Sequence, residues 1–151
     1  MKYLLDTHAL IWYFENSSRL PSKTKKIIND NGNAIYLCTV SLWEIAIKIN
    51  SGKLELRLPF EEFLDEVRKR DFDLLQIKEE HLKRLTALHL LHRDPFDRML
   101  VATALVEKLT ILTVDENIYK YAVPCLWQWE NTREPATVLP FAAAKKANSA
   151  K

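Results

Sequence analysis

The chain has 151 residues, 48% hydrophobic and 28% charged, which suits one globular domain able to form its own core. Its net charge of +2 implies no particular partner, and its 2 glycines form neither GxGxxG nor GxxxxGK[ST], which argues against a glycine-rich phosphate loop. No apolar run approaches the ~20 residues of a membrane span. Asp6 interrupts the first apolar segment, so we expect no signal peptide. Together these features predict a cytoplasmic protein without membrane association.

Strands and helices alternate along the first half of the chain. Apolar segments predict strands over residues 2–5 and 34–40, and helical spacing predicts helices over 7–14, 21–29 and 41–50. Ser41 and Glu44 match the capping-box pattern S-x-x-E at the start of the third helix, and Gly52 marks its end. The two cysteines, Cys38 and Cys125, lie in strand-like segments without metal-ligand spacing, which indicates buried free thiols in a reducing cytosol.

The second half continues the alternation. We predict helices over 59–67, 78–89, 96–108 and 116–121, and strands over 72–77, 110–114 and 123–127. Asp94 is a natural N-cap, Pro95 suits the first helical position and Asp97 falls in the first turn. This order predicts a single-domain, three-layer α/β/α fold with a mostly parallel central sheet over residues 1–130. Residues 131–151, rich in alanine and lysine, predict a flexible tail.

Four acidic residues follow or lie near the short apolar segments: Asp6, Glu44, Asp97 and Asp115. In open α/β sheets the ligand site lies beyond the carboxyl ends of the strands, so these side chains are expected to converge there. Crowded carboxylates repel one another and raise each other's pKa. A hard divalent cation, which prefers oxygen ligands, is the usual compensation. The pattern therefore indicates a metal site suited to phosphodiester chemistry.

Each acid also has a purely structural explanation. Asp94 and Asp97 could stabilise a helix start, Glu44 could complete a capping box, and Asp115 could cap the helix that follows it. Asp6 could end a strand at the surface, although an unpaired charge directly after a buried strand would be costly. Taken together, the structural explanation needs four separate coincidences at one edge of the sheet, so we favour a shared site.

Four segments carry a family resemblance: LLDTHALIW, SLWEIAIK, HRDPFDRMLVATA and LTVDENI. Together, in this order and at this spacing, they resemble the PIN-domain ribonucleases, and within them the branch that includes VapC-type toxins of bacterial toxin–antitoxin pairs. The resemblance covers about residues 1–127. It implies a metal-dependent endoribonuclease, with an RNA substrate and an antitoxin protein as partner. We also expect a homodimer, because an oligomer would build a longer basic groove for RNA.

The resemblance also implies the site residues. Asp6, Glu44, Asp97 and Asp115 would be the catalytic acids and hold Mg²⁺ or Mn²⁺, and Asp94 matches a further acid of this branch. We assign Asp6 and Asp97 as the most direct ligands. Glu44 and Asp115 would bind through water or hold a second metal about 3.5–4 Å away.

Several polar residues near the four acids could have either a functional or a purely structural role. Thr7, Ser41 and Thr113 could orient ligands or water. Arg93 and Arg98 could contact RNA phosphates, or form ion pairs with Asp94 or Asp97. His8 and His92 could act as general bases, but a hydrogen-bonded structural role is the stronger explanation for both.

The four tryptophans could stack RNA bases. Trp12 and Trp43 lie beside core-spaced residues, so packing is favoured for them. Trp127 and Trp129 alternate as in a strand, which would leave one facing solvent or a partner.

Other functions remain open at this point. A phosphatase of the haloacid-dehalogenase type would need a second aspartate two residues after Asp6, where this chain has His8. A catalytically silent RNA- or protein-binding module on the same fold, or a housekeeping nuclease, are the remaining alternatives. Divalent-metal binding by the protein would separate the silent module from either nuclease.

Overall fold

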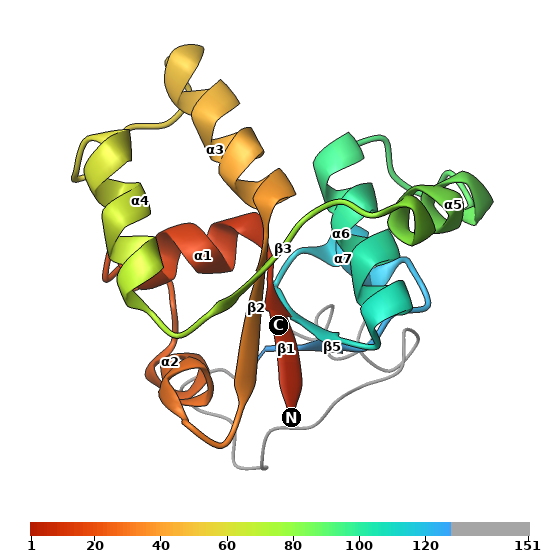
Figure 1. Ribbon diagram of the computed structural model, residues 1–151, viewed down its shortest axis with the longest axis horizontal. Helices are drawn as coiled ribbons and strands as arrows, with labels where there is room; N and C mark the ends of the chain where they lie inside the picture. The colour runs from red at the N-terminus through yellow and green to blue at the C-terminus, as the bar shows by residue number, and fades with distance from the viewer. Residues whose placement is uncertain (128–151) are drawn as a thin grey trace.

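The computed structural model describes residues 1–127 of the chain, and these form a five-stranded, entirely parallel sheet with helices on both faces (Figure 1). The strand order is β3-β2-β1-β4-β5. This confirms the predicted three-layer α/β/α fold with a mostly parallel sheet. The elements are β1 Lys2–Leu5, α1 Thr7–Phe14, α2 Ser22–Asn29, β2 Ala34–Cys38, α3 Thr39–Asn50, α4 Phe60–Lys69, β3 Asp73–Leu75, α5 Glu79–Ala87, α6 Pro95–Glu107, β4 Thr110–Leu112, α7 Glu116–Tyr119 and β5 Cys125–Leu126.

The first strand of the chain is the central strand of the sheet. β1 pairs in parallel with β2 on one side, with Tyr3 opposite Ile35, and with β4 on the other, with Tyr3 opposite Thr110. Its residues Tyr3, Leu4 and Leu5 are buried, as expected for a strand covered on both faces. Because all five strands run the same way, the residues that follow β1, β2 and β4 meet at one edge of the sheet.

Alternate residues of β1 serve two separate cores. Tyr3 and Leu5 pack into the cluster formed with α1, α2, α3 and α4, whereas Leu4 packs into the cluster formed with α6 and α7. Figure 1 shows α1, α2 and α4 on one side of the sheet and α5, α6 and α7 on the other. α3 continues directly from β2 and contacts both α1 and α6, so it lies across the carboxyl edge where the two layers meet.

The helix that carries Glu44 starts earlier than predicted. β2 ends at Cys38 and α3 begins at Thr39, so Cys38 rather than Ser41 is the N-cap, and no side chain caps this helix. The capping box of Ser41 and Glu44 is therefore wrong. Both residues lie within α3 and face other helices instead, because the chain turns directly from strand into helix without a loop.

The remaining differences concern boundaries. The third and last strands are shorter than expected, at Asp73–Leu75 and Cys125–Leu126. The expected positions of Asp94 and Pro95 at the start of α6 are confirmed, and Asp97 lies in its first turn. Cys38 and Cys125 are buried free thiols. Trp129 and the tail predicted from residue 131 lie outside the described residues. Within residues 1–127, no helix is long and apolar enough to span a membrane.

Candidate active site

Asp6 is buried between the end of β1 and the start of α1, with 3% of its surface exposed. Its Oδ1 accepts a hydrogen bond from the Ala9 N–H at 2.7 Å and caps α1, while its Oδ2 accepts one from the Thr113 hydroxyl. Burial raises the pKa of Asp6 to about 6, against the opposing effect of these two hydrogen bonds. Asp6 is thus held rigidly, but its ionised form is costly.

Glu44 is equally buried, at 3% exposed, on the first turns of α3. Its Oε1 accepts a hydrogen bond from the Thr7 hydroxyl at 2.7 Å, and its Oε2 lies 2.6 Å from the Lys48 ammonium one turn later. The Thr7 oxygen also lies 3.0 Å from the Ser41 hydroxyl. Thr7 and Ser41 therefore join α1 to α3 around the carboxylate of Glu44.

Thr113, directly after β4, links two of the acids. Its hydroxyl donates to Asp6 and accepts the backbone N–H of Asp115 at 3.0 Å. Asp115 in turn caps α7 by accepting from the Asn117 N–H at 2.9 Å. One buried hydroxyl thus fixes the carboxylate that follows β1 relative to the acid that follows β4.

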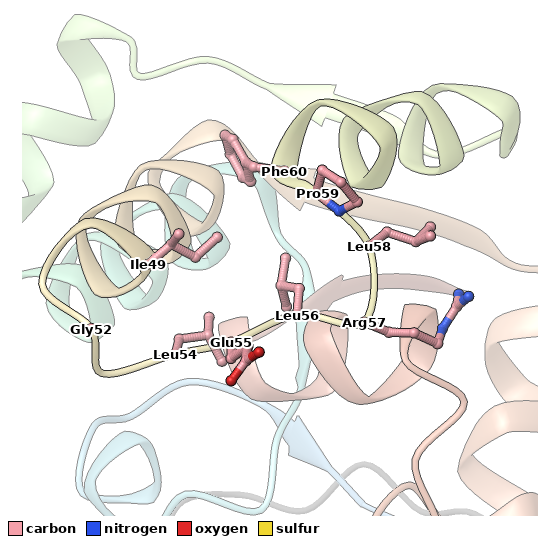
Figure 2. Close-up of a pocket in the computed structure, with 9 residues that line it drawn as sticks. All are labelled: Ile49, Gly52, Leu54, Glu55, Leu56, Arg57, Leu58, Pro59 and Phe60. Atoms are coloured by element: carbon pink, nitrogen blue, oxygen red, sulfur yellow. The ribbon is translucent and has the colours of Figure 1, made fainter.

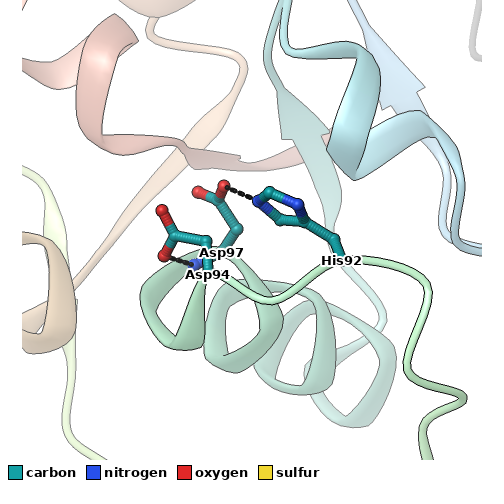
Figure 3. Close-up of side chains that lie close together, drawn as sticks. All are labelled: His92, Asp94 and Asp97. Atoms are coloured by element: carbon teal, nitrogen blue, oxygen red, sulfur yellow. Dashed lines mark hydrogen bonds and ion pairs between the residues drawn. The ribbon is translucent and has the colours of Figure 1, made fainter.

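The start of α6 presents two more carboxylates. Asp94 Oδ1 accepts hydrogen bonds from the N–H groups of Phe96 at 2.8 Å and Asp97 at 3.2 Å, which caps the helix. Asp97 Oδ2 lies 3.2 Å from Nε2 of His92 (Figure 3). The Asp97 side chain is only 14% exposed.

The electrostatics show that these acids share one neighbourhood. The pKa of Asp97 is raised to about 8, first by burial and then by the charges of Asp94, Asp115, Glu44 and Asp6. Acids from α1, α3, α6 and α7 therefore act on one another at the carboxyl edge of the sheet. This donor set fits a divalent cation, because such an ion binds carboxylate oxygens and relieves their repulsion.

The tightest group of possible metal ligands includes a histidine. Within the described part of the chain, His92, Asp94 and Asp97 are the one set of three residues whose ligand atoms all lie within 4.8 Å of one another (Figure 3). Asp6, Glu44 and Asp115 are not in this set, although their charges raise the pKa of Asp97, and Asp6 and Glu44 already have partners for both oxygens.

Sequence reasoning missed two partners of these acids. The ion pair of Lys48 with Glu44 could have been predicted, because residues at i and i+4 on one helix lie side by side. The contact of His92 with Asp97 had no clear signal, because His92 lies in a loop whose path depends on Tyr121.

Three other residues lie differently from what we expected. His8 is exposed with its ring tilted against Trp12, and among the described residues no side-chain hydrogen bond gives it the structural role that we expected. Trp43 makes a T-shaped ring contact with Phe96 at 5.2 Å but is 60% exposed, so the expectation that it is mainly a packing residue is wrong. Arg98 donates to the Leu88 carbonyl at 3.4 Å and, in the described structure, pairs with neither Asp94 nor Asp97.

Arg93 is exposed beside the acids.

Trp12 is half-buried against Trp127, with 6.0 Å between their ring centroids. Packing is therefore confirmed for Trp12 but not for Trp43.

A separate groove of about 560 Å³ lies between the end of α3 and the start of α4 (Figure 2). Its lining is mostly apolar, with Ile49, Leu54, Leu56 and Phe60 turned toward it. None of the acids described above lines it, so the groove is not part of the acidic site.

The sequence matches the family model of the PIN domain over residues 3–124. This chain belongs to the PIN-domain family. Members of this family are generally nucleases that use divalent metals. The PIN domain is also similar in fold to a chain in the crystal structure of VapBC2 from Rickettsia felis bound to a DNA fragment from their promoter. The match has a TM-score of 0.62 and 16% sequence identity, and covers 80% of this chain and 92% of the other. No curated protein matches this PIN domain.

Proposed function

We propose that this PIN domain is a divalent-metal-dependent endoribonuclease and the toxin of a toxin–antitoxin pair. The observation that carries the nuclease proposal is the environment of Asp97, whose pKa is raised to about 8 by burial and four neighbouring carboxylates. Such crowding disfavours the ionised acids unless a cation joins them. Asp6, Glu44, Asp97 and Asp115 would hold Mg²⁺ or Mn²⁺, with Asp94 beside them.

The chain's own residues would prepare the site in distinct ways. Ala9 and Thr113 hold the Asp6 carboxylate in place, and Thr7 and Lys48 hold that of Glu44. A bound ion would supply an activated water and polarise the scissile phosphate. Arg93, exposed beside Asp94, is the better placed of the two arginines to contact an RNA phosphate.

The toxin proposal rests on the fold and on exposed apolar side chains. The similar structure from Rickettsia felis is a complex of two partners, named VapBC2. In this chain Trp43 and Ile47 on α3 are 60% and 40% exposed, and Leu90 in the loop before α6 is 70% exposed. Trp43 and Ile47 are four residues apart on α3 and so share one face of this helix, and an exposed apolar face favours burial by a protein partner. We propose that an antitoxin covers this face of α3 and that the nuclease forms a homodimer.

The test of the nuclease proposal is cleavage of end-labelled RNA by the purified protein. We expect cutting with Mg²⁺ or Mn²⁺ and none with a chelator. Asp6→Asn, which keeps the shape of the side chain, should reduce the rate at least about 100-fold, since loss of even an indirect metal contact costs about 10–100-fold. Asp71→Asn is the matched control, because Asp71 is an exposed acid just before β3, at the opposite edge of the sheet.

Growth of a host that lacks any antitoxin separates the alternatives. Expression of the parent should arrest growth, whereas Asp6→Asn should not. Cleavage without growth arrest would favour a housekeeping nuclease. RNA binding without metal-dependent cleavage would favour a silent binding module, and would refute the proposed activity.

A further inference from the structure

The imidazole of His92 lies among the acids at the start of α6, and the function proposed above gives this side chain no role. Its Nε2 is 3.2 Å from Oδ2 of Asp97, and both residues belong to the group with Asp94 in which one ligand atom from each lies within 4.8 Å of the others. Figure 3 shows the ring turned toward the Asp97 carboxylate rather than out of the site. The ring is 22% exposed, which leaves it accessible to an ion from solvent.

The backbone of His92 is held from a distant part of the chain. Its N–H donates to the Tyr121 hydroxyl at 3.1 Å, and that hydroxyl lies 3.4 Å from its carbonyl oxygen. Tyr121 is 3% exposed, so it is itself held by the core beside α7. The loop is thereby fastened on both sides of the Cα of His92, which fixes where the imidazole begins. A loop histidine that only needed to reach solvent would not require this support.

The distances suit joint binding of one ion by His92 and Asp97. Adjacent ligands of an octahedral ion bound at about 2.1 Å lie about 3 Å apart, close to the observed separation of 3.2 Å between Nε2 and Oδ2. Asp94 uses Oδ1 to cap α6, which leaves its second oxygen for the same ion or its water (Figure 3).

We propose that His92 is a nitrogen ligand of the metal and that it makes the site prefer Mn²⁺ and Co²⁺ over Mg²⁺. The inference rests on the proposed metal-dependent function and specifies its donor set. Mg²⁺ prefers oxygen ligands, whereas imidazole affinity rises along the series from Mn²⁺ to Cu²⁺. A site of carboxylates alone would discriminate less between Mg²⁺ and these ions. The neutral ring would bind through the Nε2 lone pair, in place of its present contact with Asp97.

Metal binding without RNA tests the proposal directly. The tag-free full chain is titrated with Mn²⁺ by electron paramagnetic resonance, alone and in competition with Mg²⁺. His92→Gln should weaken Mn²⁺ binding about tenfold or more while changing Mg²⁺ affinity by less than about threefold. His89→Gln, an exposed histidine three residues earlier, should change neither affinity. Equal losses for both ions would overturn the proposal, because they would indicate a structural role for His92.

A spectroscopic signature identifies the ligand itself. Bound Mn²⁺ should show ¹⁴N coupling in electron spin-echo spectra, which changes when the wild-type chain carries ¹⁵N-histidine and disappears in His92→Gln. The labelled wild type gives an answer even if the variant fails to fold. Bound Mn²⁺ without nitrogen coupling would refute the proposal, whether or not RNA is cut. Coupled Mn²⁺ without RNA cleavage would leave His92 as a ligand and refute the nuclease activity alone. Absence of any metal binding would refute both.

Discussion

The acidic site has an inner and an outer side that treat their carboxylates differently. On the inner side, Asp6 and Glu44 are 3% exposed, and protein groups contact all four of their oxygens. On the outer side, His92 is the one side-chain partner that the described residues give to the Asp97 carboxylate. The pKa of Asp97, at about 8, is also higher than the pKa of Asp6, at about 6.

This difference indicates two tasks for the same type of residue. Hydrogen bonds and a lysine hold the inner carboxylates in place, so these acids help to join α1, α3 and the residue that follows β4. The outer carboxylate stays in conflict with its neighbours, so a bound cation gains most there. Three substitutions test this division, and each has a control outside the site.

The largest expected change in stability comes from Thr113→Val on the inner side. The variant removes the hydroxyl that donates to Asp6 and accepts from the Asp115 N–H, and it leaves one buried carboxylate oxygen of Asp6 unpaired. The free energy of unfolding of the metal-free protein at pH 7 should fall by about 1–3 kcal/mol. The loss should be smaller at pH 5, because the pKa of Asp6 is about 6 and its charged form depends most on the bond.

Urea unfolding at the two pH values measures this effect. Thr110→Val, at the other end of β4, is the control for the same change of atoms and should have little effect. An equal loss in both variants would mean that Thr113 contributes packing alone.

A change of opposite sign is expected on the outer side, from Asp97→Asn. Because the pKa of Asp97 is raised from 3.8 to about 8, the folded protein holds a proton that the unfolded chain releases between these values. Stability should therefore fall as the pH rises from about 4 to 8. Asn removes this loss. The metal-free variant should be more stable at pH 8 by about 1 kcal/mol, or about 3 °C in Tm, after a small loss of helix-dipole stabilisation.

Thermal unfolding in the presence of a chelator, from pH 4 to 9, measures how Tm changes with pH in the parent and in Asp97→Asn. Asp65→Asn, an exposed acid on α4, should keep the parent's slope. A lower Tm for Asp97→Asn across the whole range would instead assign Asp97 to the support of α6 alone, and the two sides would no longer differ.

The smallest expected change is that of Lys48→Met. The Lys48–Glu44 pair is 2.6 Å long and has one buried partner, with side-chain exposures of 34% and 4%. Its loss should reduce the free energy of unfolding by about 0.5–1 kcal/mol, at the upper end for an exposed pair. Lys69→Met breaks a pair at 3.2 Å whose side chains are 71% and 47% exposed, and should cost less than about 0.3 kcal/mol. Equal costs in urea unfolding would show that Glu44 needs no counter-charge.

Some elements around the site could be predicted from the sequence, and others could not. Continuous apolar strands predicted the sheet, and cap chemistry at Asp94 and Pro95 predicted the start of α6, because both signals are local. The start of α3 could not be predicted in the same way. Ser41 and Glu44 have the spacing of a capping box, yet the helix begins at Thr39, and their polar groups face Thr7 of α1 instead.

Contacts between distant segments explain what else was missed. Trp43 has apolar neighbours at helical spacing, but the T-shaped contact with Phe96 of α6 leaves 60% of it exposed. The position of His92 depends on Tyr121, 29 residues later. Neither feature has a signature within its own segment, because each depends on the relative placement of two helices or loops.

The central position of β1 has a consequence for when the protein becomes functional during synthesis. The strand at residues 2–5 pairs with β4 at Thr110–Leu112, and Asp6 bonds Thr113, 107 residues later. At about 5–20 residues per second, a ribosome needs on the order of ten seconds to reach β4 after it has added β1. From the addition of residue 44 until that of residue 110, Asp6 and Glu44 are both present but the β4 segment is missing. A nascent chain that ends before residue 110 therefore has these acids without the strand that positions them.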